Sequence, residues 1–266
     1  MSRILLVGCG NMGGAMLAGW LAGGCEASEF TVVDPYLADA PAGVALLRDI
    51  PEGGAFDVVL LGFKPQQFAE ASAPIIPVVG EGSIVLSILA GVDLATLRRR
   101  FPHAGAVVRV MPNLAAALGK SSIGLFGDGP EASRKVVDAL MAPLGTAEWV
   151  AREELMDVVT ALAGSGPAFV YRLIDTLAAG AVALGLPRDQ ADRLALGMVE
   201  GASALAAASP LAPGDLADRV ASPGGTTRAG LDVLDDDGRL AALIAETLRA
   251  ARDRGTEMAA EARAKG

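Results

Sequence analysis

Histidine, cysteine and aromatic residues are scarce in this chain. Its 266 residues include one histidine and two cysteines, and aromatic residues make up 4% of the total. With so few imidazole and thiol groups, the sequence offers no Cys/His cluster for zinc, and we expect no bound metal. Cys9 lies inside a glycine-rich turn, so a structural disulfide is not expected, and the two thiols fit a reducing, cytoplasmic compartment.

Positive charge and long apolar runs are also lacking. The formal net charge is -9, and the only basic cluster, Arg98–Arg100, ends a predicted helix, where it complements the helix dipole. Without a basic patch we expect no nucleic-acid partner. No apolar run reaches membrane-spanning length without an interrupting proline, glycine or charge, so we expect no membrane partner either.

What the chain does have is a glycine-rich stretch at its start. A short apolar run, Arg3–Val7, leads into Gly8-Cys9-Gly10-Asn11-Met12-Gly13. A helical pattern follows, and then a second apolar run, Phe30–Val33, which ends in Asp34. This order is typical of dinucleotide-binding proteins: the first glycine permits a tight turn, the second lets a pyrophosphate approach, and the third lets helix and strand pack closely. The alternative is a glycine-rich turn that binds nothing.

Further strands and helices alternate after Asp34. The expected strands are Phe56–Leu61, Ser83–Ile88, Ala106–Val110, Ser122–Phe126 and Ala147–Val150, and helices are expected from Gln66, over Asp93–Arg100 and over Pro130–Met141. Alternation of this kind predicts an α/β fold with an N-terminal Rossmann-type, doubly wound sheet. Such sheets bind ligands at the carboxyl ends of their strands, which is where the sequence places Gly8, Asp34, Lys64, Ala90 and Asn113.

The composition changes near residue 151, and no convincing strand follows. We therefore place a dinucleotide-binding domain at residues 1–151 and an all-α domain at residues 152–266. The expected helices are Glu153–Leu186 with an interruption at Gly164–Pro167, then Pro187–Ala208, Pro213–Arg219, a brief helix after Thr227, and Gly238–Ala262. So short a domain cannot bury all of its Ala- and Gly-rich faces alone, so we expect dimerisation through it. The alternative is a monomeric bundle.

Groups for acid–base catalysis are few. The single histidine, His103, follows a peripheral helix, and the chain has four lysines and no Tyr-x-x-x-Lys pair. Reduction of a carbonyl with a strong general acid is therefore poorly supported. A cyclic imine can arrive already protonated, so its reduction needs only a hydride, correct position, a hydrogen bond to nitrogen and an anchor.

Two segments have the composition to position and anchor such a substrate. Ala163–Ala168 places small residues and the hydroxyl of Ser165 in a helix, where a ring could lie close, although close helix packing explains it equally well. Ser222–Thr227 combines a Pro-Gly-Gly turn with two threonines that start the next helix. Bare amides beside hydroxyls form a cradle for a carboxylate. The alternative for this segment is an ordinary capped loop.

Five motifs, in chain order, resemble those of the pyrroline-5-carboxylate reductases, the enzymes that make proline. The matching segments are Phe63–Gln66, Ser87–Val92, Arg109–Asn113, Ala161–Phe169 and Val220–Leu231. The last contains Ser-Pro-Gly-Gly-Thr-Thr and is highly specific, whereas the glycine turn is not. The resemblance runs from Gly8 to about Arg254, nearly the whole chain.

Together with the glycine turn, the resemblance implies a set of ligand contacts. Cofactor contacts would come from Gly8, Gly10, Asn11, Met12, Gly13, Asp34, Phe63, Lys64, Pro65, Ala90 and Asn113. Substrate contacts would come from Ser165, Ser222, Gly224, Gly225, Thr226 and Thr227, with Thr227 as the catalytic residue at the imine nitrogen. The family is typically a domain-interlocked dimer and often a decamer. One departure is that the family usually reads Asn-Thr-Pro where this chain has Asn113-Leu114-Ala115, beside the expected nicotinamide pocket.

For the choice between NADH and NADPH, the resemblance and the residues give different predictions. The family commonly uses NADPH. Here the second strand ends in Asp34, and a carboxylate at that position accepts hydrogen bonds from the ribose hydroxyls of NADH and repels a 2′-phosphate. No cation follows directly, although Arg48 could fold back from the next loop. We therefore expect a preference for NADH or use of both, and the alternative is that Asp34 only ends the strand.

The function implied by the resemblance is NAD(P)H-dependent reduction of 1-pyrroline-5-carboxylate to L-proline, the last step of proline biosynthesis. One alternative is reduction of another cyclic imino acid, such as a 2-carboxylate isomer. A second alternative is a dinucleotide-binding sensor without turnover. The intact Ser222–Thr227 segment argues against the sensor, whereas the Leu114-Ala115 departure leaves it open.

Overall fold

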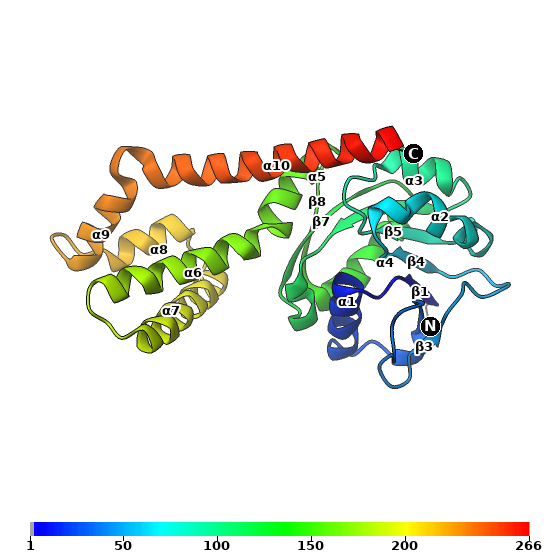
Figure 1. Ribbon diagram of the computed structural model, residues 1–266, viewed down its shortest axis with the longest axis horizontal. Helices are drawn as coiled ribbons and strands as arrows, with labels where there is room; N and C mark the ends of the chain where they lie inside the picture. The colour runs from blue at the N-terminus through cyan, green and yellow to red at the C-terminus, as the bar shows by residue number, and fades with distance from the viewer. Residues whose placement is uncertain (1–2, 266) are drawn as a thin grey trace. The chain divides into compact units, whose positions relative to one another are not determined.

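A single sheet organises the N-terminal part of the computed structural model, which describes residues 3–265 (Figure 1). Its eight strands are β1 Ile4–Val7, β2 Phe30–Val33, β3 Ala45–Leu47, β4 Val58–Leu61, β5 Ile84–Ser87, β6 Ala106–Met111, β7 Ser121–Gly127 and β8 Gly145–Trp149. Their order across the sheet is β3-β2-β1-β4-β5-β6-β7-β8. The first six follow the order of a doubly wound dinucleotide-binding sheet. The predicted α/β fold class is therefore confirmed.

The strands form where short apolar segments are covered on both faces, as a parallel sheet requires. All four residues of β1, of β4 and of β5 are buried. All neighbouring strands run parallel except β6 and β7, which are antiparallel. The sequence did not predict that β7 runs antiparallel to β6, because an apolar run does not indicate the direction of its strand.

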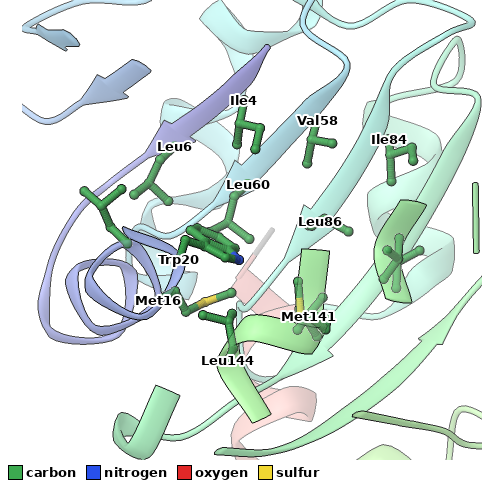
Figure 2. Packing of buried hydrophobic residues seen from close by; sticks show 14 of the residues in the cluster. Ile4, Leu6, Met16, Trp20, Val58, Leu60, Ile84, Leu86, Met141 and Leu144 are labelled. Atoms are coloured by element: carbon green, nitrogen blue, oxygen red, sulfur yellow. The ribbon is translucent and has the colours of Figure 1, made fainter. Parts of the chain in front are cut away.

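Helices from different parts of the chain cover the two faces of this sheet. Side chains of α1 (Asn11–Ala22) and α4 (Glu131–Met141) pack on one face, and those of α3 (Leu94–Arg100) pack on the other, with short helical segments around α2 (Phe68–Ala71). In Figure 2, Met16 and Trp20 of α1 lie with Met141 of α4 against Leu60 and Leu86 of the sheet. This packing fixes the start of α1 beside the end of β1.

Trp20 is the largest fully buried side chain of this core. Its ring stacks on that of Phe30 with centroids 5.3 Å apart, and its indole N–H donates to the carbonyl of Leu140 at 2.7 Å. The one polar atom of the indole is therefore satisfied, which burial of a tryptophan requires. Through this residue α1, β2 and α4 are held together.

The segment after β4 and the segment after β2 differ from their predictions. The helix expected from Gln66 is broken into a 3₁₀ turn at Pro65–Gln67, α2 and a second 3₁₀ segment, Ala73–Val78. Prolines inside this stretch remove the amides that a continuous helix would need. β3 was not predicted at all, since three residues give no periodic signal.

The chain divides into two compact units. The first contains the sheet and continues through Gly164, and it also includes the chain from Ala250 onward; the second is Ser165–Arg249. The first unit extends past the change of composition at residue 151 because α5 (Leu155–Val159) buries Met156 there. The domain boundary at 151 stays a prediction.

One expected helix, Glu153–Leu186, is three helical pieces in the structure. α5 passes directly into a π-helix, Thr160–Gly164, and α6 (Gly166–Ala183) follows after Ser165. The predicted interruption at Gly164–Pro167 coincides with the end of the π-helix. Single π-turns inside helices are frequent at functional sites.

The second unit is helical throughout its described length, as predicted. Its helices are α6, α7 (Arg188–Ala208), α8 (Pro213–Val220), α9 (Thr226–Asp235) and the first part of α10 (Arg239–Lys265). α6 and α7 lie side by side (Figure 1), and the apolar cluster between them has only Ala178, Ala191 and Ala195 as buried members. Three alanines are a very small core for a unit of this size.

Large apolar side chains remain exposed on the helices of the second unit. They are Val170, Tyr171, Leu173, Leu177, Val182 and Leu184 on or after α6, and Leu194, Leu196, Met198 and Leu205 on α7. Contiguous exposed apolar faces mark surfaces that another protein covers. Among the residues described, no single helix is both long and apolar enough to cross a bilayer; α7 and α8 pass that test only as a pair, bent by 119°.

Candidate active site

The carboxyl ends of the first strands lie at one edge of the sheet. Val7 of β1 is in register with Val33 of β2 and with Leu61 of β4, and Leu61 is in register with Ser87 of β5. The residues that follow these strands therefore share that edge, as the sequence predicts. It is the edge where doubly wound sheets bind their ligands.

The glycine turn after β1 leaves no room for a side chain at Gly8 or Gly13 but leaves open space at Gly10. Gly8 has a φ of +87°, and a Cβ there would lie 2.7 Å from the amide nitrogen of Phe63. A Cβ on Gly13 would lie 2.7 Å from the carbonyl oxygen of Gly8. A Cβ on Gly10, in contrast, would meet nothing within 4 Å. Gly10 therefore faces open space of the kind that a pyrophosphate would fill.

The start of α1 presents unpaired amides beside this space. Gly10 is the N-cap and no side chain caps the helix; the first amide to bond is that of Gly14, which donates to the carbonyl of Gly10 at 2.7 Å. The amides of Asn11, Met12 and Gly13 have no hydrogen-bond partner in the described part of the chain. Free amides at a helix N-terminus bind phosphate groups. The turn therefore fits a dinucleotide.

Asp34, expected at the ribose, is largely occupied by the backbone. Its Oδ2 accepts from the amide of Cys9 at 2.8 Å, and its Oδ1 accepts from the amides of Tyr36 at 2.8 Å and Leu37 at 3.0 Å. Burial raises the pKa of this carboxyl, but the three amides and the charge of Arg48 outweigh burial and hold the pKa below its ordinary value of 3.8. Asp34 therefore ties the glycine turn to the loop after β2 as an anion.

Arg48 does fold back onto that loop. It directly follows β3, and its Nη1 donates to the carbonyls of Asp34 at 2.8 Å and Leu37 at 2.6 Å. The guanidinium is exposed beside the loop that follows β2. The sequence left open that this arginine, the nearest downstream cation, could fold back from the next loop, and the two hydrogen bonds show that it does.

The other expected cofactor residues line the same edge. Phe63 is half-buried with its amide against Gly8, Lys64 is exposed, and Pro65 opens the 3₁₀ turn after them. The amide of Lys64 donates to Oε1 of Gln67 at 3.3 Å, which leaves the ammonium group at the surface. Ala90 is exposed in the loop after β5.

Asn113 acts as a clamp between three backbone segments. Its Oδ1 accepts from the amide of Ala115 and its Nδ2 donates to the carbonyl of Ala163, both at 3.0 Å, while its own amide donates to Oγ of Ser121 at 2.9 Å. The side chain is buried, and both ends of its amide are engaged. Asn113 therefore holds the π-helix against the end of β6; its contact with a cofactor stays a prediction.

A polar cleft of about 510 Å³ lies beside Gly91 in the first unit. Its lining includes Arg109 of β6 and Glu153, which form an ion pair at 2.7 Å, and Arg252 and Thr256 of α10. Sequence reasoning missed this pair, although a single arginine inside the apolar run of β6 was a usable signal. Within residues 3–265, no three His, Cys, Asp or Glu side chains gather closely enough to hold a metal ion.

The predicted substrate segment of the second unit is a tight turn. The amide of Gly225 donates to the carbonyl of Ser222 at 2.9 Å, and Gly224 has a φ of +68°. With proline second and a left-handed glycine third, this is a type II turn. A Cβ on Gly225 would lie 2.4 Å from Oγ of Ser222, so the serine hydroxyl closes over the glycine.

The turn delivers the chain into α9 with its first amides free. The amide of Ala229 is the first to bond, to the carbonyl of Gly225 at 3.1 Å, and the described residues offer no partner to the amides of Thr226, Thr227 and Arg228. Both threonine side chains are exposed. Free amides and two hydroxyls at one helix start fit a small carboxylate with a polar neighbour.

Arg228 links the start of α9 to α8. Its Nη2 lies 2.7 Å from Oδ1 of Asp218 on α8, and hydrogen bonding to Asp218 raises the pKa of the guanidinium. Arg228 is therefore committed to α8 and α9. Ser165, the remaining substrate candidate, is half-buried on a different element, between the π-helix and α6.

Comparisons with known proteins agree on one family. Residues 153–258 match the family model described as pyrroline-5-carboxylate reductase dimerisation. The pyrroline-5-carboxylate reductase of Pseudomonas aeruginosa is 34% identical over 266 residues, covering 97% of each chain. The Coxiella burnetii reductase structure has a TM-score of 0.90 at 29% identity, covering 96% of this chain and 98% of that one. A Plasmodium falciparum pyrroline carboxylate reductase with NADP bound shares the fold, with a TM-score of 0.81 at 22% identity, covering 97% of this chain and 98% of that one.

Proposed function

The chain belongs to the pyrroline-5-carboxylate reductase family, and we propose on that basis that it reduces 1-pyrroline-5-carboxylate to L-proline. The observation that carries the proposal is the Ser222–Gly225 turn with the free amides of α9 behind it. This turn supports a carboxylate anchor, and the hydroxyls beside it support a hydrogen bond to the ring nitrogen. A nicotinamide dinucleotide held at the glycine turn would supply the hydride.

The reaction asks little acid–base chemistry of the protein. A hydride adds to the imine carbon, and the nitrogen ends as an amine with one more proton than the neutral imine carried. A cyclic imine that binds as the iminium brings this proton with it, so no side chain has to donate it. We assign to Thr227 the hydrogen bond that orients the nitrogen, and to the amides of Thr226 and Thr227 the carboxylate.

We assign the dinucleotide contacts to the edge described above. The amides of Asn11, Met12 and Gly13 would bind the pyrophosphate, and Phe63, Lys64, Pro65 and Ala90 would line the path toward the nicotinamide. Asp34 keeps one acceptor direction on Oδ2, enough for one ribose hydroxyl. That remaining direction supports the use of NADH.

Ala115, at the position where the family has proline, supports a second candidate substrate class. Where the family has proline, this chain has an amide that bonds to Oδ1 of Asn113, and a proline at this position would have no such donor. The change occupies Asn113 and alters the wall beside the π-helix. A cyclic imino acid with its carboxylate at the 2-position is therefore the alternative substrate.

We further propose a homodimer as the minimal assembly, with a decamer as the larger form that the family resemblance implies. The exposed apolar faces of α6 and α7 support this assembly. We propose the cytoplasm as its compartment, because Cys9 and Cys25 are both free thiols.

The decisive experiment measures oxidation of NADPH and of NADH with three additions: 1-pyrroline-5-carboxylate, 1-pyrroline-2-carboxylate and buffer. Turnover with the 5-carboxylate and formation of L-proline on a chiral column would support the proposal. Turnover with the 2-carboxylate alone would replace it by the alternative. Dinucleotide binding without turnover on either imine would identify a sensor.

A further inference from the structure

Arg48 stands where an adenosine ribose would meet the protein. β2 and β3 are parallel with Val33 opposite Leu47, so the residues that follow, Asp34 and Arg48, lie side by side. The amide of Asp34 donates to the carbonyl of Leu47 at 3.2 Å, which extends this pairing to the end of the strands. In doubly wound sheets, the residue that follows the second strand faces the ribose of the adenosine.

The carboxylate of Asp34 is bonded mainly to the backbone, which limits its ability to exclude a phosphate. Three of its four in-plane acceptor directions are taken by backbone amides, those of Cys9, Tyr36 and Leu37. The positive ends of these three N–H dipoles face the carboxylate and partly offset its negative potential. The repulsion between Asp34 and a 2′-phosphate is correspondingly weaker than the sequence alone predicts.

The guanidinium of Arg48 is held in place by one nitrogen only. Nη1 bonds to the carbonyls of Asp34 and Leu37. Nε and Nη2 have no hydrogen-bond partner among the backbone and side-chain groups that the structure describes, and the side chain is exposed. An arginine whose fork is fixed at one nitrogen and open at the other two is pre-organised for a phosphate oxygen pair.

We propose that Arg48 binds the 2′-phosphate of NADPH through Nε and Nη2, so that this chain accepts NADPH in spite of Asp34. The proposal rests on the dinucleotide role of the glycine turn. It makes Arg48 the residue that determines cofactor specificity, whereas Asp34 positions the loop after β2, to which Arg48 bonds.

Binding of two adenine nucleotides that differ only in the 2′-phosphate tests this assignment without substrate or turnover. Isothermal titration calorimetry would compare adenosine 2′,5′-bisphosphate with 5′-AMP on the wild type and on Arg48→Gln. Glutamine keeps an N–H for one of the two carbonyls and removes the charge. We expect a loss of about tenfold or more for the bisphosphate, the size of a charge-assisted hydrogen bond, and less than about twofold for 5′-AMP.

Two further variants separate specific recognition from general effects. Arg48→Lys keeps the charge without the fork and should fall between wild type and Arg48→Gln. Arg99→Gln removes the same charge from an exposed arginine whose side chain bonds to Oγ1 of Thr96, and should leave both affinities unchanged. An equal loss for both nucleotides in Arg48→Gln, or a wild type that does not distinguish them, would overturn the proposal.

Failure of the proposed function would look different. If neither nucleotide, nor NADPH itself, bound to the wild type, the dinucleotide role of the glycine turn would be wrong. If both nucleotides bound with Arg48-dependent discrimination but no imine were reduced, the specificity assignment would stand and the substrate assignment would fall.

Discussion

Arg109 and Glu153 are 2.7 Å apart, and the same carboxylate oxygen also accepts from the amide of Leu94 at 2.7 Å. The side chain of Arg109 is only 8% exposed. One carboxylate therefore joins the buried arginine of β6 to the start of α3, directly after the Ala90-Gly91 loop. The loop expected beside the nicotinamide is thus fixed from a residue more than fifty positions downstream in the chain.

Removal of Glu153 should destabilise the first unit. Glu153→Ala leaves a buried guanidinium and a helix amide without their partner. We expect the free energy of unfolding to fall by about 1–3 kcal/mol, less than for a fully buried ion pair, because Glu153 is partly exposed. Glu153→Gln retains one acceptor oxygen and should recover part of the loss. Differential scanning calorimetry at one protein concentration measures both, with Glu154→Ala, an exposed neighbour, as control. A Tm of Glu153→Ala equal to that of the control would contradict this role.

The contribution of Asp34 to stability should disappear in acid. Its pKa is lower in the folded chain than in the unfolded chain, so the folded state binds fewer protons and loses stability as pH falls through that range. The Tm difference between wild type and Asp34→Asn should be largest at neutral pH and should shrink below about pH 4. Asp39→Asn, an exposed carboxylate in the same loop, is the control. A gap that widened toward acid pH would sink the assignment.

Gly10 and Gly13 should respond differently to alanine. At Gly10 a methyl group meets nothing within 4 Å, so Gly10→Ala should fold normally while its methyl occupies the pyrophosphate space. At Gly13 the methyl would lie 2.7 Å from the carbonyl oxygen of Gly8, so Gly13→Ala should also lower the Tm. Melting curves and NADPH titrations distinguish the two. Full NADPH affinity in Gly10→Ala would show that the pyrophosphate lies elsewhere.

Thr227→Ala should lower kcat/KM for the imine and leave NADPH affinity unchanged. The lost hydrogen bond is worth about 1–3 kcal/mol, roughly ten- to hundredfold in kcat/KM. Thr227→Ser restores a hydroxyl at the same position and should recover most of the rate, whereas Thr227→Val keeps the shape and should not. Steady-state kinetics with unchanged kcat/KM in Thr227→Ala would remove this residue from the mechanism.

Association should depend on α7. Sedimentation at micromolar concentration should give a species of at least twice the monomer mass, because the second unit cannot cover its apolar faces alone. Leu205→Glu places a charge on the exposed apolar face of α7 and should shift the protein toward monomer. Leu118→Glu makes the same change at an exposed leucine of the first unit and serves as control. A stable monomer of the wild type would refute the dimer.

The glycine turn was predicted correctly because all the residues that shape it are close together in the sequence. The strand before it, the glycines within it and the carboxylate at Asp34 all lie within one βαβ unit, where spacing alone limits the geometry. The alternation of later segments likewise predicted the sheet and its binding edge. Most other helix and strand ends were displaced by only a few residues, as capping and fraying allow, whereas the helices expected from Gln66 and over Glu153–Leu186 are broken.

Other features depended on contacts that no local pattern encodes. The return of Arg48 to Asp34 requires β3, whose three residues pair with β2 only in the folded sheet. The clamp made by Asn113 requires Ala163, fifty positions away, to arrive at the end of β6. The pair of Arg109 with Glu153 is long-range in the same way. The sequence could raise the return of Arg48 as an option, but it could not pair Asn113 with Ala163 or Arg109 with Glu153.

The first unit is divided in the sequence, with residues 165–249 between its two parts. During synthesis the strands leave the ribosome early and can begin to fold, since domains form from the N-terminus onward. The stretch of α10 that carries Thr256, whose hydroxyl donates to Asp157 at 2.9 Å, is translated only after residues 165–249. Every nascent chain therefore passes through a stage in which its sheet lacks this helix while its apolar helices still await a second chain, and we expect chaperones that recognise apolar surface to bind it there.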